Sequence, residues 1–119
     1  MSSALAESNV VAEKLELLRS RAAIRSVDVA KMLGTTPETV SRWSHGRTYP
    51  RSSKESLLGD LEYIVDRLSD FYSDARTARG WLFSRHRYFG GARPADLIRE
   101  GRIDEVLEAI QSMDNPTHT

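Results

Sequence analysis

Hydrophobic residues near the N-terminus recur at the spacing of a helix. Residues 1–8 are small and polar, so we expect a frayed tail there. A second, short helix is predicted over 27–33, because Ser26 is a good N-cap and Gly34 suits a left-handed turn. Between the tail and this helix, steps of four, three and four residues define one face of a longer helix: Val11, Leu15, Leu18 and Ala22.

The next two helices are predicted from their start signals. Thr36 can cap a helix that has Pro37 at its first position, where the missing N–H costs nothing, and this helix should end before Gly46. The run SSKE at 52–55 has the form of a capping box before the longest helix, predicted over 53–72. The apolar stripe of that helix favours packing inside one molecule, as a spine between two modules, although the same stripe could pack against a helix of a second molecule. Its residues are Leu57, Leu61, Ile64, Leu68 and Phe71.

The C-terminal half predicts shorter helices around a glycine turn. Gly90 and Gly91 indicate a turn or hinge, and no stretch of the sequence alternates as a strand would. The predicted helices run from the Ser73-Asp74 cap through Phe83, from Pro94 to Glu100, and from Ile103 to Met113.

Residues 26–45 have the pattern of a helix-turn-helix unit. Such a unit needs a small residue within its first helix and a glycine in the turn, and Ala30 and Gly34 fill these positions. The unit resembles the Xre/Cro repressor class, except that Thr35 replaces a residue that is usually apolar. Apolar residues are present where the two helices would meet: Val29, Leu33, Val40 and Trp43.

The expected fold class is therefore all-α. It comprises an Xre/Cro-like helix-turn-helix domain at 9–52, joined by the long helix to a small helical domain, with the linking helix and this second domain together covering 53–119.

In a helix-turn-helix protein the second helix lies in the major groove of DNA. Arg42 could read a guanine, while Arg47 and Arg51 are better placed for phosphates. Glu38 favours the alternative that the two helices serve only packing or protein contact, because a carboxylate repels phosphates unless it accepts a hydrogen bond from cytosine. The predicted DNA-binding residues are Thr36, Glu38, Thr39, Ser41, Arg42, His45, Arg47 and Arg51.

The charge is distributed unevenly although the net charge is +0. Residues 19–51 hold seven basic and two acidic residues, whereas residues 94–114 hold two basic and six acidic ones. The first segment suits a polyanion, although an unevenly charged solvated surface would have the same composition.

From Trp81 onward the sequence has a Trp-Leu helix end, a Gly-Gly turn, a helix that begins at a proline and ends at a glycine, and a last amphipathic helix. This ordered set resembles the toxin-binding domain of Xre/MbcA/ParS-type antitoxins, and its PADLIREG segment is most similar to the mycobacterial MbcA type. The family usually has Pro-Asn after the tryptophan-containing helix, whereas this chain has Arg85 and His86. The residues that carry the resemblance are Trp81-Leu82, Gly90-Gly91, Pro94 to Leu97, Gly101 and Val106-Leu107.

The resemblance implies an antitoxin of a type II toxin–antitoxin pair. Its partner would be a RES-domain toxin that destroys NAD, or a ParT-like ADP-ribosyltransferase, with the antitoxin blocking the NAD pocket and repressing the shared operon. The acidic last helix could occupy such a pocket, or it could simply close the domain. The residues expected to bind the toxin are Arg85, Arg87, Arg93, Asp96, Arg99, Glu105, Glu108 and Met113.

Two features of this segment remain to be interpreted. Trp81 is expected to lie in the core rather than to contact the partner. Arg85, His86 and Arg87 form either a basic patch for an acidic toxin surface or a merely solvated run.

The composition argues against catalysis. There is no cysteine, and the three histidines are far apart in the sequence, so no enzymatic activity, metal or cofactor is expected. No secretory signal and no apolar run of about 18 residues is present, which predicts a cytoplasmic protein without a membrane partner.

Operator DNA is the second expected partner. One recognition helix buries too little surface for tight binding, so a homodimer or a higher toxin–antitoxin assembly is expected. The alternatives are a stand-alone helix-turn-helix transcriptional regulator without a toxin, and an interaction module whose helix-turn-helix is silent.

Overall fold

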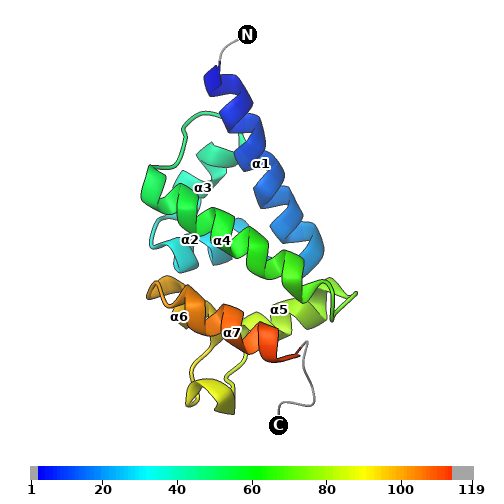
Figure 1. The fold of residues 1–119 in the computed structure, drawn as a ribbon. Coiled ribbons are helices and arrows are strands. Elements are labelled where there is room, and N and C mark those ends of the chain that lie inside the picture. The colour runs from blue at the N-terminus through cyan, green and yellow to red at the C-terminus, as the bar shows by residue number, and fades with distance from the viewer. Residues whose placement is uncertain (1–2, 114–119) are drawn as a thin grey trace.

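The computed structural model describes residues 3–113, with side chains from Val10 onward, and this part of the chain is helical without strands. The predicted all-α class is confirmed, while residues 114–119 of the predicted second domain lie outside the described range. The elements in Figure 1 are α1 (Ser3–Ala22), α2 (Ser26–Leu33), α3 (Pro37–Ser44), α4 (Ser52–Leu68), α5 (Ala75–Phe83), the 3-10 helix η1 (Arg87–Phe89), α6 (Pro94–Arg99) and α7 (Ile103–Met113).

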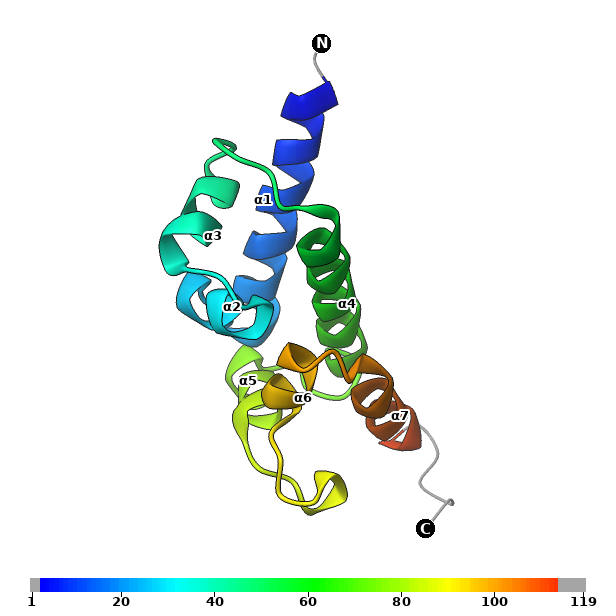
Figure 2. The ribbon, with the colours of Figure 1, turned by 90° about the vertical axis from the view of Figure 1, so that its left-hand side faces the viewer.

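Two long helices, α1 and α4, organise the molecule. They pack against each other, with α3 against α1 and α2 against both α3 and α4 (Figures 1 and 2). The remaining helices form a layer beneath these four, in which α5 contacts α1, α6 contacts α2 and α7 contacts α4 (Figures 1 and 2). The molecule is consequently elongated, with principal extents of 51 × 23 × 22 Å.

A single hydrophobic core joins the N-terminal and C-terminal helices. The stripe on α4 supplies much of it, because this helix packs on α1 through one side and on α7 through another. The stripe therefore serves as a spine within one molecule. Its fully buried members are Leu58, Leu61, Ile64, Val65 and Leu68.

Two predictions about the N-terminal elements are wrong. Helix α1 begins at Ser3, so residues 3–8 of the expected tail are helical, because this segment is rich in alanine and other good helix formers. Helix α2 is capped at Arg25 rather than at Ser26, and the backbone N–H of Arg25 donates to Asp28 Oδ2 at 2.9 Å. A carboxylate three residues into the helix thus replaces the expected serine cap.

The predicted start and end of α4 also differ from the structure. Arg51 occupies the N-cap without a side-chain cap, and Glu55 instead accepts a hydrogen bond from the Tyr49 hydroxyl, so no capping box forms. The helix ends at Leu68 rather than at 72, because the N–H groups of Phe71 and Tyr72 both turn back to the Leu68 carbonyl. This reversal brings α5 back against α1.

Candidate functional sites

The α2–α3 pair has the packing that its sequence predicted. Gly34 ends α2 in the left-handed conformation at φ 71°, and Thr36 Oγ1 caps α3 by accepting from the Thr39 N–H at 3.2 Å. Ala30 is 2% exposed. All four apolar residues predicted at the meeting of the helices are buried: Val29, Leu33, Val40 and Trp43.

The opposite side of α3 is polar and accessible. Arg42 on α3 and Arg47 and Arg51 on the following loop are exposed, and no side chain in the described part of the chain pairs with them. Thr39 and Ser41 are half-buried, whereas the other predicted DNA-contact residues are exposed: Thr36, Glu38 and His45.

His45 has a local structural role. Its Nδ1–H donates to the Ser41 carbonyl at 2.8 Å, and this hydrogen bond closes the last turn of α3. The assignment of this surface to DNA stays a prediction.

A second candidate surface lies on the loop between α5 and α6. Arg85 and Arg87 are exposed there, and Arg85 Nη1 donates to the Gly91 carbonyl at 3.1 Å. His86 is half-buried, and its Nε2–H donates to the Trp81 carbonyl at 2.7 Å. His86 therefore organises the loop and does not belong to an exposed three-residue patch.

The expectation that Trp81 lies in the core is met only in part, because its side chain packs against the core without being fully buried. Trp81 is only half-buried, because it packs at the base of the loop, with its ring centroid 5.2 Å from that of His86 and 6.3 Å from that of Phe89. The buried positions of α5 are Ala78 and Leu82 instead.

Helices α6 and α7 present charged residues to solvent. Arg93 is half-buried, because its Nε–H donates to the Phe83 carbonyl at 3.0 Å. Glu105 is bound through both oxygens by Arg102, at 2.6 and 2.8 Å, and these hydrogen bonds hold the pKa of Glu105 below its usual range. The other residues predicted to bind a toxin are exposed, apart from half-buried Met113: Asp96, Arg99 and Glu108.

The structure reveals one site that sequence reasoning missed, an ion pair between α2 and α5. Arg79 donates to Asp28 through Nη1 at 2.7 Å and through Nη2 at 3.1 Å, and Nη1 also donates to the Ala23 carbonyl at 2.7 Å. Its guanidinium lies 4.7 Å from the ring centroid of Phe83. The two residues are 51 positions apart, so no sequence pattern indicates that they pair. Only the capping of α2 by Asp28 could have been predicted from neighbouring residues.

The ion pair explains how a carboxylate is tolerated at 6% exposure. Burial alone would raise the pKa of Asp28, but hydrogen bonds from Arg79 and from the Arg25 N–H outweigh it and hold the pKa below its usual value. Asp28 is therefore a charged structural residue.

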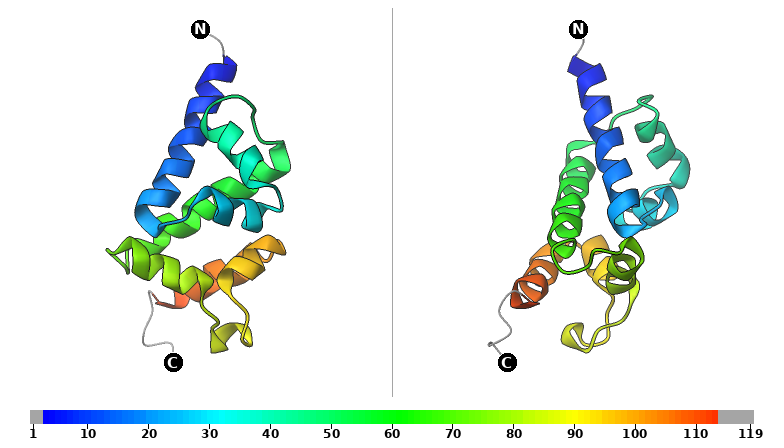
Figure 3. Two further views of the ribbon diagram at one scale, coloured as in Figure 1. Left: turned by 180° about the vertical axis from the view of Figure 1, so that it is seen from behind. Right: turned by 90° about the vertical axis from the view of Figure 1, so that its right-hand side faces the viewer.

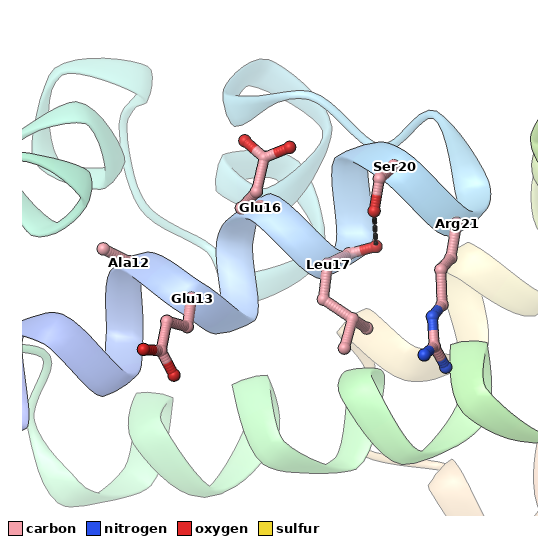
Figure 4. A pocket seen from close by; sticks show the side chains of 6 residues that line it. All are labelled: Ala12, Glu13, Glu16, Leu17, Ser20 and Arg21. Carbon is pink, nitrogen blue, oxygen red and sulfur yellow. Dashed lines mark hydrogen bonds between the residues drawn. The ribbon is translucent and has the colours of Figure 1, made fainter.

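The hollow shown in Figure 4 does not assemble a catalytic group. It runs along α1 beside α4, where Leu17 and Arg21 point towards α4 and Glu16 points away. Arg21 is paired with Asp66 at 2.7 Å, and the Ser20 hydroxyl donates to the Leu17 carbonyl at 3.2 Å. Within this hollow the Ser20 hydroxyl is thus bound to a carbonyl, and Glu16 is paired with Arg19.

Comparisons with known families agree with this arrangement. The sequence model of the family described as "Antitoxin Xre/MbcA/ParS C-terminal toxin-binding domain" matches residues 57–115. The helices from α4 to α7 thus define an antitoxin of the Xre/MbcA/ParS class.

Individual relatives extend the match to nearly the whole chain. The mycobacterial cidal antitoxin MbcA of Mycobacterium tuberculosis (strain H37Rv) is 30% identical over 105 residues, which cover 88% of this chain and 92% of that protein. The probable mycobacterial cidal antitoxin Rv3188 of the same strain is 31% identical over 93 residues, 75% of each chain. The chain belongs to the Xre/MbcA/ParS family of antitoxins and is similar to MbcA within it.

A solved structure supports the same relationship. A chain in the crystal structure of the M. tuberculosis MbcT-MbcA toxin–antitoxin complex superposes with a TM-score of 0.80 at 28% sequence identity, covering 93% of this chain and 99% of that chain. Among the described residues, no helix combines the length and the apolar character that crossing a membrane would require.

Proposed function

We propose that this chain is the antitoxin of a type II pair, and that it binds and blocks an NAD-consuming RES-domain toxin in the cytoplasm. The observation that carries the proposal is the match of nearly the whole chain to a chain of a crystallised toxin–antitoxin complex. The family model that covers α4 to α7 supports the C-terminal helices as the toxin-binding part. In this role the chain binds macromolecules and does not catalyse.

The charged surface of α6 and α7 is suited to an NAD pocket. Such a pocket must hold an anionic dinucleotide, so it provides basic groups that an acidic helix can occupy in place of the ligand. Glu108 is exposed, whereas Glu105 is already bound by Arg102. Glu108 is therefore the better candidate of the two for direct contact with the toxin.

The proposal is tested by mixing the purified chain with the toxin candidate encoded beside it. We expect a stable complex in size-exclusion chromatography and loss of NAD consumption by the toxin. NAD loss without modification of a protein would indicate a RES-domain toxin. Transfer of ADP-ribose from NAD to a protein, with release of nicotinamide, would indicate a ParT-like partner. Absence of any complex would contradict the proposed function and favour a stand-alone transcriptional regulator.

We further propose that α3 reads operator DNA and that the antitoxin represses its own operon as a homodimer. The geometry supports this, because α3 lies at the surface with its apolar side buried against α1 and α2. Arg42 on α3 and Arg47 and Arg51 on the loop after it are exposed, and arginine is suited both to a base contact and to phosphate contacts.

Two arginine variants separate base reading from phosphate binding. Arg42→Ala should weaken operator binding by about 1–3 kcal/mol and relax the base preference at one position. Arg47→Ala should weaken binding evenly across sequences and reduce its salt dependence. Gel shifts with the upstream region measure both, with Arg76→Ala, at an exposed position of α5, as the control. Operator binding that neither variant changes would contradict a DNA role for this surface.

A further inference from the structure

The segment 84–93, here called the 84–93 loop, projects from the end of the molecule that lies farthest from α3. It connects α5 to α6 and contains η1, and it stands apart from the helical body in each view (Figures 1 and 3). The loop lies within the matched toxin-binding domain at 57–115.

Although it projects, the loop is held in one conformation by its own hydrogen bonds. The backbone of His86 pairs with Ala92 and Gly91, through N–H···O distances of 3.1 and 2.9 Å. Gly90 and Gly91 adopt left-handed conformations at φ 65° and 92°, which side chains with a Cβ rarely adopt. The side-chain contacts of Arg85, His86 and Arg93 to backbone carbonyls, described above, fix its base. A loop ordered before binding loses little entropy when it docks.

The tip of the loop exposes an aromatic ring on an aromatic support. Tyr88 is 60% exposed, the largest fraction of any large hydrophobic side chain that the structure describes. Its ring centroid lies 5.2 Å from that of Phe89, which in turn packs edge-on against Trp81. Tyrosine and arginine are the residue types that most often anchor protein interfaces.

The loop is basic and its neighbours are acidic. Residues 84–93 contain three arginines and no acidic residue, and Arg87 is exposed with no partner among the described side chains. The following segment, 94–114, has a net charge of −4, so the positive charge is confined to the loop and matches a local acidic patch rather than an extended polyanion such as nucleic acid. An acidic protein surface fits the loop better than a polyanion does.

We propose, building on the toxin binding proposed above, that the 84–93 loop is a preformed docking finger. Tyr88 inserts into an apolar pocket of the toxin, and Arg87 and Arg85 contact an acidic rim around that pocket. His86 is a positioning residue that holds the finger through the Trp81 carbonyl.

The test is a calorimetric titration of the toxin into the full-length chain and its variants. Tyr88→Ala should weaken binding about 30-fold, as the loss of an interface anchor does. Arg87→Glu should weaken binding more than Arg87→Gln, because only the former adds repulsion from an acidic rim. Controls outside the matched toxin-binding domain are Val27→Ala on α2, where the valine is 37% exposed, and Arg47→Glu on the loop after α3, and both should bind the toxin as the wild type does.

The outcomes separate this inference from the proposed function. If the wild type binds the toxin and both Tyr88→Ala and Arg87→Glu bind equally well, the docking finger is refuted while the antitoxin function stands. Equal losses for Arg87→Gln and Arg87→Glu would refute the acidic rim. Loss of DNA binding rather than toxin binding would assign the loop to nucleic acid. A wild type that binds no toxin would overturn both proposals, and thermal melts of each variant confirm that the fold is kept.

Discussion

Replacing Trp43 by alanine should lower the free energy of unfolding by about 4 kcal/mol. Trp43 is 3% exposed, and with Val40 it forms the buried side of the eight-residue helix α3. A helix this short is held in place by packing rather than by its own hydrogen bonds. Loss of the Trp43 side chain should therefore release α3 from α1 and α2. Urea unfolding followed by circular dichroism measures the difference, and Trp43→Phe, a smaller change, should remain folded.

Trp81→Ala is the matched control for this prediction. Trp81 is only half-buried at the base of the 84–93 loop, so its loss should cost about 2 kcal/mol. Equal destabilisation by the two substitutions would contradict the burial described for α3 and α5.

Breaking the buried ion pair should have the second largest effect. Arg79→Met removes two hydrogen bonds to a carboxylate that is 6% exposed, and we expect a loss of about 3 kcal/mol of stability. The control Arg76→Met, on the exposed side of the same helix, should change stability by less than about 0.5 kcal/mol. The measurement is again the midpoint of urea unfolding.

A double variant isolates the cause of that loss. Asp28→Asn removes the charge but keeps an oxygen that can accept from the Arg25 N–H. The Arg79→Met and Asp28→Asn double variant should therefore be more stable than Arg79→Met alone, since no uncompensated charge stays buried. A double variant that is less stable than the single one would contradict this explanation.

The same carboxylate predicts a dependence of stability on pH. The folded state lowers the pKa of Asp28, so its ionised form stabilises folding fully above the unfolded pKa, at about pH 4, and this contribution disappears as the pH falls through the lower folded pKa. As the pH falls below about 4, the free energy of unfolding should fall more steeply for the wild type than for Asp28→Asn. Parallel pH profiles of the two proteins would contradict the role given to Asp28.

The elements predicted well from the sequence are those specified by local signals. The cap at Thr36, the proline at the first position of α3 and the left-handed Gly34 each act within a few residues, and all lie where the sequence placed them. The buried face of the α2–α3 pair followed from helical periodicity for the same reason.

Features that depend on distant contacts could not be predicted. Glu55 has the spacing of a capping box, but the Tyr49 hydroxyl binds it instead. Trp81 is apolar and large, and only the fold of the following loop leaves it half-exposed. Arg79 and Asp28 meet because α5 returns to α1 and α2, and no pattern within either helix indicates this.

The candidate surfaces also contain some positions that the sequence predicts and others that it does not. Exposed positions on α3 followed from its periodicity, whereas Arg93 and His86 were expected at the surface and are held by backbone carbonyls. These two contacts depend on the path of the 84–93 loop, which its glycines allow but do not determine.

Growth and cellular NAD in a host that expresses the toxin encoded beside this chain test the central claim most directly. Expressed alone, the toxin should deplete NAD and arrest growth. Co-expression of this chain should restore both, and a variant carrying Tyr88→Ala and Arg87→Glu should restore them less. NAD that stays depleted in the presence of the wild-type chain, with both proteins soluble, would contradict its function as the antitoxin.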